Sequence, residues 1–366
     1  MTPPFRADHI GSLLRPKDLT QAYRARGEGK LSESEFKAAQ DKAVRETVAL
    51  QERLGLEVVT DGEFRRASYW SHWIDAIDGL SVGESLFKFH DERGTEQTFI
   101  CPICKGKLKK VAPISTEEFK FLKSVAKAEP KITMPSPSTF HFWRGNRGLQ
   151  NSGYADAAAF YDDLCVIYRQ EIADLAALGC RYVQIDEVAL IMLGDPEVRA
   201  KVTARGEDPD ALMTLYIKAM NDSVKGRPKG VTAAMHICRG NFKGRWLSEG
   251  GYDAIAERVF KEVDVDAFAL EYDTPRAGDF KPLAHVPKGK TVVLGLVSTK
   301  TPVLEGGDGL VKRIEEAARY MPKEHLCLSP QCGFASTVAG NPVTIEDEQK
   351  KLALVVDVAK RVWGSA

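Results

Sequence analysis

The sequence has no excess charge of either sign, because 51 basic side chains are matched by 51 acidic ones. This balance argues against nucleic acid or an anionic membrane as the main partner. No apolar run approaches the ~20 residues needed to cross a bilayer, and the first residues, MTPPFRADHIG, contain no hydrophobic signal-peptide segment. We therefore expect a cytoplasmic protein.

A disulfide framework is not expected either. The seven cysteines are an odd number spread over 366 residues, and in a reducing compartment such cysteines are more often thiols or metal ligands. CPIC at 101–104 supplies only two ligands, and no second pair follows at the spacing of a zinc knuckle. We interpret CPIC as a surface turn with two inert thiols that does not bind a catalytic metal.

The sequence does contain a regular alternation of short apolar or β-branched runs with helix-period stretches, and no internal repeat or low-complexity segment interrupts it. This alternation predicts an α/β protein, a (β/α)8 TIM barrel rather than an open doubly wound sheet, as one domain over residues 1–366. The predicted strands are 5–12, 56–63, 131–138, 181–187, 230–238, 266–272, 291–298 and 325–331. The predicted helices include 32–54, 155–178, 209–225, 252–263, 307–321 and 345–362.

The connection between the second and third predicted strands is much longer than the others. It contains ESLFKFHDERGTEQTFICPICKGKLKK, and connections of that length usually carry their own structure or form a lid. We predict a β-rich insertion at 84–115, with helical pieces at 67–77 and 116–127.

Polar side chains collect at the ends of the predicted strands, where a barrel places its chemistry. His236 and Cys238 share one face of the fifth strand because side chains alternate along it. Glu271 ends the sixth strand and Cys332 follows the eighth. Zinc binds these residue types, but a buried cysteine, a hydrogen-bonded histidine and a surface carboxylate explain the same pattern about equally well.

Six motifs in one order make the pattern more specific. They are IGS (10–12), DGEF (61–64), QIDE (184–187), HIC (236–238), LEYD (270–273) and SPQCGF (329–334). Together they resemble the catalytic barrel of cobalamin-independent methionine synthase, and more closely its short single-barrel relatives. The resemblance covers nearly the whole chain outside the predicted insertion.

The resemblance implies a set of site residues at the matching motifs. It implies His236, Cys238, Glu271 and Cys332 as zinc ligands, Glu63 and Asp186 as carboxylates that hold the amino group of homocysteine, and Ile10 and Ser12 as the segment that receives its carboxylate. For Glu63 and Asp186 the structural alternative is a salt bridge to Arg65 or Arg66.

The charge of this ligand set favours one kind of chemistry. Two thiolates and one carboxylate around Zn²⁺ sum to −1, which suits holding an incoming thiol as a reactive thiolate better than generating hydroxide. We therefore predict methyl transfer to a zinc-bound thiolate, with homocysteine and a methyl donor as small-molecule partners. A zinc hydrolase, a structural zinc protein and a metal-free decarboxylase-like barrel are the alternatives.

The chain differs from the family pattern in the residues that would protonate the methyl donor. A methylfolate must be protonated before its amine can leave, and the resemblance implies an Asp-x-His for this task after the seventh strand. GLVSTKTP (295–302) places Ser298 and Lys300 there instead. We therefore keep Lys300, Ser298 and Arg239 as catalytic candidates, with His72 or His141 as other sources of a proton.

The donor can therefore be a methylfolate or another methyl compound. The alternative activity is alkyl transfer like that of epoxyalkane–coenzyme M transferases. Lys300 or Arg239 could stabilise the alkoxide of an opened epoxide, but a sulfonate-bearing thiol would favour cations over Glu63 and Asp186. Aromatic residues near the second and third strands could stack on the donor or pack in the core; they are Trp70, Trp73, Phe142 and Trp143. The choice between a monomer and a homodimer stays open.

Overall fold

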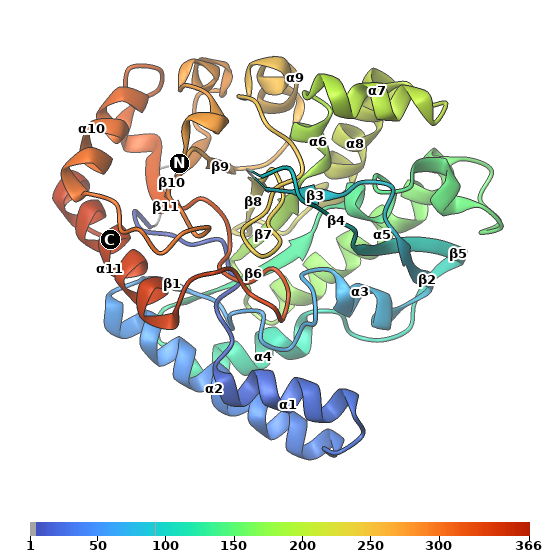
Figure 1. Ribbon diagram of the computed structural model, residues 1–366, viewed down its shortest axis with the longest axis horizontal. Coiled ribbons are helices and arrows are strands. Elements are labelled where there is room, and N and C mark those ends of the chain that lie inside the picture. The colour runs from blue at the N-terminus through green and yellow to red at the C-terminus, as the bar shows by residue number, and fades with distance from the viewer. Residues whose placement is uncertain (1–4, 92) are drawn as a thin grey trace.

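The computed structural model describes residues 5–91 and 93–366, so residues 1–4 of the predicted domain and residue 92 of the predicted insertion lie outside the description. Its main sheet has seven strands in the order β1-β6-β7-β8-β9-β10-β11. Figure 1 shows this sheet curled, with helices around its outer side. The strands are β1 (Val58–Val59), β6 (Glu129–Pro135), β7 (Tyr182–Glu187), β8 (Thr232–Ile237), β9 (Ala267–Glu271), β10 (Thr291–Val297) and β11 (Leu326–Pro330).

All neighbouring strands of this sheet run parallel. Every residue of β9, β10 and β11 is buried, as expected for parallel strands covered on both sides. The register places His236 of β8 opposite Asp186 of β7 and Ala269 of β9. The polar strand ends found in the sequence therefore lie at one end of the sheet.

The predicted helices are present to within a few residues. The longest, α2, begins with a capping box between Ser32 and Glu35 and ends at Leu54, after which Gly55 caps it with a φ of 90° that suits glycine. None of the helices in the described ranges combines the length and apolar composition needed for a membrane crossing. The helices are α1 (Lys17–Gly27), α2 (Glu33–Leu54), α3 (Ser71–Ala76), α4 (Thr116–Val125), α5 (Ala157–Ala177), α6 (Ala189–Met192), α7 (Pro196–Ala204), α8 (Pro209–Val224), α9 (Asp253–Glu262), α10 (Gly307–Ala317) and α11 (Ile345–Trp363).

The first predicted strand, residues 5–12, is represented by a short parallel bridge between Ala7 and Leu328 of β11. The Asp8 N–H donates to the Leu328 carbonyl at 2.9 Å, and the Leu328 N–H donates to the Arg6 carbonyl at 2.9 Å. The predicted eight-stranded barrel is therefore observed as a curled seven-stranded parallel sheet with residues 6–8 alongside its last strand.

Antiparallel strands occupy the long connection between β1 and β6. β2 (Ile77–Glu84) pairs with β5 (Ile100–Lys110), and β3 (Phe89–His90) pairs with β4 (Glu96–Gln97). The β-rich content matches the prediction, but the antiparallel structure begins at Ile77, before the predicted boundary at residue 84.

The prediction of a surface turn at 101–104 is wrong. Cys101 and Cys104 lie within β5 and are only 0% and 1% exposed. Pro102 also lies within β5, because a two-stranded sheet consists of edge strands, where a missing N–H is tolerated. Burial raises the pKa of the Cys101 thiol to about 12 and also raises that of Cys104, which keeps both thiols protonated.

Candidate metal centre and substrate cavity

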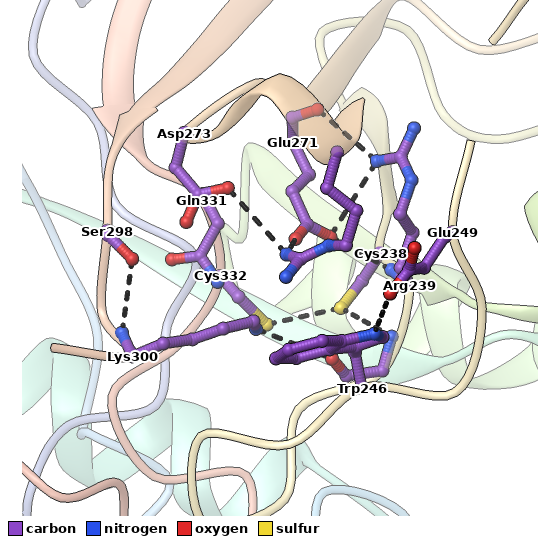
Figure 2. A network of polar contacts seen from close by, with 12 residues as sticks. Cys238, Arg239, Trp246, Glu249, Glu271, Asp273, Ser298, Lys300, Gln331 and Cys332 are labelled. Carbon is purple, nitrogen blue, oxygen red and sulfur yellow. Dashed lines mark hydrogen bonds and ion pairs between the residues drawn. The ribbon is translucent and has the colours of Figure 1, made fainter. Parts of the chain in front are cut away.

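Three potential metal ligands converge at the carboxyl ends of the strands. His236 of β8, Cys238 directly after it, and Cys332 in the loop after β11 place their ligand atoms within 4.8 Å of one another. The two Sγ atoms lie 3.4 Å apart, and Figure 2 shows them facing each other. Two sulfurs bound tetrahedrally to one zinc ion would lie about 3.8 Å apart, so this pair fits a shared ion with a small adjustment.

The hydrogen bonds around these side chains leave their ligand atoms available. His236 Nδ1 lies 3.1 Å from the Ala269 carbonyl oxygen, which places the ring proton on Nδ1. Its Nε2 is buried and has no hydrogen-bond partner among the described residues. The Gly240 N–H donates to Cys238 Sγ at 3.2 Å, a contact that stabilises a thiolate. A buried, unpaired imidazole nitrogen beside two thiols fits a soft divalent metal.

Glu271, the fourth predicted ligand, is completely buried at the end of β9. Its carboxylate accepts hydrogen bonds from the Arg239 backbone N–H at 2.9 Å and from Arg276 Nη2 at 2.8 Å. Burial favours the neutral acid, but Lys300, Arg239 and Arg276 together lower the pKa of Glu271 to about 2. Glu271 is therefore an ionised group beside the metal-binding group, which in the described part of the chain comprises His236, Cys238 and Cys332 alone.

Arg239 and Arg276, which both contact Glu271, are each packed against an aromatic ring. The guanidinium of Arg239 stacks on Tyr252 at 4.6 Å from the ring centroid, and its Nε donates to the Gly250 carbonyl at 2.8 Å. Arg276 lies 4.4 Å from the ring centroid of Trp246. Arg276 and Trp246 were not identified from the sequence, because they lie in short segments between the strands and α-helices that carry no motif or periodic pattern.

Ser298 and Lys300 follow β10, close to the cysteines (Figure 2). The Lys300 backbone N–H donates to Ser298 Oγ at 3.3 Å, and Lys300 Nζ donates to the Gly240 carbonyl at 3.4 Å. The catalytic roles of Ser298, Lys300 and Arg239 stay predictions. His141, considered as a proton donor, is buried with Nδ1 2.8 Å from the Tyr216 hydroxyl, which gives it a structural role.

A cavity of about 450 Å³ lies against the metal-binding group. It brings together most of the residues predicted for zinc and homocysteine from separate motifs. Those that line it are Ile10, Ser12, Glu63, Asp186, His236, Cys238 and Cys332.

Glu63 lines this cavity from a strained turn. Its φ of 60° is unusual for a residue with a side chain. The carboxylate accepts a hydrogen bond from the Thr133 hydroxyl at 2.7 Å, while Arg66 Nη1 is 3.8 Å away. Arg66 pairs more closely with Glu118, at 2.7 Å. The main salt-bridge partner of Arg66 is therefore Glu118 and not Glu63. Burial raises the pKa of Glu63.

Asp186 lines the same cavity from the end of β7. Its carboxylate accepts a hydrogen bond from the Gln184 side chain at 2.7 Å. Burial raises the pKa of Asp186 to about 7, and the nearby Glu63 carboxylate adds to the rise. A bound ammonium group would relieve the repulsion between these two carboxylates.

Ser12 is held against the loop that carries Cys332. The Phe334 N–H donates to the Ser12 carbonyl at 2.9 Å. A Cβ atom at Gly333 would lie 1.9 Å from Ser12 Oγ and 3.1 Å from Ser12 Cβ, so a larger residue there would displace the Ser12 side chain. The predicted carboxylate-binding segment and the Cys332 loop therefore pack directly on each other.

Four aromatic rings in mutual contact line the cavity, and we call Phe89, Phe99, Trp143 and Phe242 the aromatic wall. The centroid of Phe89 lies 4.9 Å from that of Phe99 and 5.4 Å from that of Phe242, and Phe99 lies 5.2 Å from Trp143. All four residues line the cavity. The sequence suggested only Trp143, because the phenylalanines come from short segments far apart in the chain.

The other aromatic candidates divide between cavity and core. Trp70 lines the cavity. Trp73 is buried with its ring centroid 4.1 Å from that of Tyr168, and Phe142 is stacked on Phe87 at 4.9 Å. Trp73 and Phe142 therefore pack in the interior.

Comparisons with known proteins identify relatives of this chain. The family model described as "Cobalamin-independent synthase, Catalytic domain" matches residues 5–361. "Uncharacterized protein YxjG" of Bacillus subtilis (strain 168) is 39% identical over 370 residues, which cover 99% of this chain and 95% of that protein. "Methionine synthase" of Pyrococcus abyssi is 29% identical over 328 residues, covering 89% and 85%. The crystal structure of a "Putative Vitamin-B12 Independent Methionine Synthase from Listeria monocytogenes" superposes with a TM-score of 0.77 at 29% identity and covers 100% of both chains.

Proposed function

Because this chain belongs to the cobalamin-independent methionine synthase family, we propose that it methylates the sulfur of homocysteine, yielding methionine, with the help of a zinc ion. The observation that carries the proposal is the convergence of a ring nitrogen of His236 and the sulfurs of Cys238 and Cys332 within 4.8 Å, at the wall of a cavity that also presents Glu63 and Asp186.

Zinc is the metal of choice for this donor set, because imidazole and thiolate together suit it better than magnesium or calcium. We include Glu271 as the fourth ligand, since its ionised carboxylate is held next to the cysteines by Arg239 and Arg276. When bound, the metal would keep the substrate sulfur as a thiolate at neutral pH.

The protein's own residues would orient homocysteine. Glu63 is buried and Asp186 is half-buried, both carboxylates line the cavity, and among the described residues no ion pair to Asp186 forms. They suit an ammonium group, which would gain charge-assisted hydrogen bonds there. Ile10 and Ser12 lie on the same cavity and are proposed to receive the carboxylate of the amino acid.

Lys300 and Arg239 are proposed to act mainly through Glu271. Both cations lower the pKa of this carboxylate, and Arg239 contacts it through its backbone N–H. Ser298 is proposed to fix the Lys300 backbone through the 3.3 Å hydrogen bond between them.

The lining of the cavity favours homocysteine over a sulfonate-bearing thiol. In the described chain, the residues that line the cavity include two carboxylates and neither lysine nor arginine. A sulfonate would lack a cationic partner there and would be repelled by Glu63 and Asp186. Epoxyalkane–coenzyme M transferase-like activity is therefore disfavoured.

We also propose that residues 5–12 act as the first strand of an eight-stranded barrel. The Ala7–Leu328 bridge and its two flanking hydrogen bonds support this closure. The single family model over residues 5–361 supports one catalytic domain, in which β2 to β5 would form an insertion after the second strand.

Two measurements test the proposed function. Purified protein should contain about one zinc ion per chain, and replacing it with Co²⁺ should give a thiolate absorption band that intensifies when homocysteine is added. Supplied with a methyl donor, the zinc protein should convert homocysteine to methionine. The proposal would be contradicted if the absorption spectrum of the fully loaded Co²⁺ protein did not change when homocysteine was added.

A further inference from the structure

We propose that the methyl donor of this site is a cationic onium compound, a sulfonium or a quaternary ammonium, bound against the aromatic wall. This inference rests on the proposed function, since it names the class of the second substrate of the same site. It follows from the charge of the cavity, the arrangement of its rings and the residues after β10.

The charge of the cavity is the first argument. Glu63 and Asp186 line it, whereas lysine and arginine are absent from its lining within the described ranges. The nearby cations are engaged elsewhere, because Arg66 pairs with Glu118 at 2.7 Å and Lys300 Nζ donates to the Gly240 carbonyl. A polyanionic donor would therefore find no counter-charge among the residues that line the cavity, whereas a cationic donor needs none.

The aromatic wall is the second argument. Its four rings contact one another in a row, with neighbouring centroids 4.9 to 5.4 Å apart. Aromatic faces attract onium groups through their quadrupole, and several rings together form the usual recognition site for methylated cations. Outside the cavity lining, Lys243 Nζ lies 5.3 Å from the ring centroid of Phe242.

The long connection between β1 and β6 builds half of this wall. Phe89 belongs to β3, and Phe99 lies between β4 and β5. The connection is tied to the loop after β8 by reciprocal backbone hydrogen bonds between His90 and Trp246, of 2.9 and 3.1 Å. Because Phe242 comes from that same loop, this anchor fixes the phenylalanines of both segments as one surface.

The proton requirement is the third argument. A neutral methylamine leaves as an amine only if an acid protonates it. The loop after β10 supplies Ser298 and Lys300, and His236 is the one histidine that lines the cavity in the described chain. An onium donor already carries the positive charge that protonation would provide.

The transfer then balances without an added acid. The thiolate sulfur of homocysteine donates an electron pair to the methyl carbon and forms the new S–C bond. The bond from that carbon to the sulfonium sulfur or ammonium nitrogen breaks, and its electron pair stays on the leaving atom. The products are a neutral thioether in methionine and a neutral thioether or tertiary amine from the donor, and no proton moves in this step.

A binding experiment tests the charge preference without turnover. Choline and its neutral isostere 3,3-dimethylbutanol are titrated into the zinc protein, with and without homocysteine. We expect choline to bind about 5- to 30-fold more tightly, as cation–π contacts predict. Phe99→Leu, which removes the ring but keeps an apolar side chain, should reduce this ratio to about 2 or less.

Phe121→Leu is the matched control, because Phe121 also lies beneath arginines, with Arg65 at 4.6 Å from its ring centroid, but does not line the cavity. It should leave the choline preference of the unmodified protein unchanged. Equal binding of choline and 3,3-dimethylbutanol to the unmodified protein would overturn the inference, as would a preference that Phe99→Leu does not reduce.

A donor assay separates this inference from the proposed function. Homocysteine is offered with S-methylmethionine, glycine betaine, methyltetrahydrofolate carrying three glutamates, or methylcobalamin. We expect methionine from the sulfonium or the quaternary ammonium arm, and the productive arm identifies which onium is used. Methionine formed only from the folate or cobalamin arm would overturn the inference and leave the proposed function intact. If no arm yields methionine and homocysteine does not perturb the cobalt spectrum, the proposed function fails as well.

Discussion

The protein contains two cysteine pairs that differ in sequence spacing and in surroundings. Cys101 and Cys104 form a CxxC motif, yet no metal-binding group in the described chain includes them. Cys238 and Cys332 are 94 positions apart, yet their sulfurs lie 3.4 Å from each other and beside His236. Proximity along the chain is therefore a weaker predictor of a metal site than position at the end of a strand.

The difference has a simple geometric cause. Side chains three positions apart in a strand point to opposite faces, so Cys101 and Cys104 diverge within β5, and Cys104 Sγ instead lies 3.1 Å from the Gly106 carbonyl oxygen. Parallel strands end at one edge of the sheet, and this brings β8 and the loop after β11 together.

The largest effect is expected from Cys238→Ser. Removing one of two thiolates should reduce the metal content from about one ion per chain to about a tenth or less, with parallel loss of methyl transfer. Elemental analysis and a methionine assay measure both quantities. Cys101→Ser is the control and should retain its metal; loss of metal from Cys101→Ser alone would reverse the comparison between the pairs.

A smaller effect is expected from Glu271→Gln. Because this carboxylate lies beside the three-residue group, its loss should weaken metal binding about 10- to 100-fold rather than abolish it. Competition with a chelator measures the affinity. If Glu271→Gln lost its metal as completely as Cys238→Ser, Glu271 would be as important for metal binding as the cysteine. If its affinity for the metal were unchanged, Glu271 would be excluded as a ligand.

Thiol titration should also distinguish the pairs. Cys238 and Cys332 line the cavity and are 4% and 5% exposed, whereas Cys101 and Cys104 are 0% and 1% exposed. Removing the metal should make about two additional thiols reactive under native conditions. Cys238→Ser should lack one of them and Cys104→Ala should show both; a gain traced to Cys101 or Cys104 would contradict the assignment.

The smallest effect concerns Cys104→Ala. Deleting this buried sulfur should lower the free energy of unfolding by about 1 kcal/mol through lost packing. Urea denaturation of the metal-loaded protein measures the change, and the zinc content should equal that of the unmodified protein. A lower zinc content in the folded variant would show that the CxxC pair takes part in metal binding.

Much of the fold could be predicted because apolar periodicity reports burial directly. The runs that became β6 to β11 and the long helices α2, α5 and α11 were located to within a few residues. The short helix α6 was missed because four apolar residues fit a strand or a helix equally well. The first strand-like run became only a bridge at Ala7, since pairing of so short a segment depends on contacts that the pattern does not encode.

The candidate site could be predicted where its residues belong to strand ends. The placement of His236 and Cys238 on one face follows from strand alternation, and the motif order brought in Cys332. The aromatic wall could not be predicted, because Phe89 and Phe242 meet only through the His90–Trp246 hydrogen bonds. Such loop contacts leave no periodic trace in the sequence.

The contact between Gly333 and Ser12 has a practical consequence for anyone who redesigns this protein. A side chain at position 333 would lie 1.9 Å from the serine oxygen and displace it, so mutagenesis libraries aimed at new acceptors should keep the glycine. Diversity is better placed in the antiparallel hairpins, where altered rings could retune donor choice while the sulfur-binding end of the pocket keeps its shape.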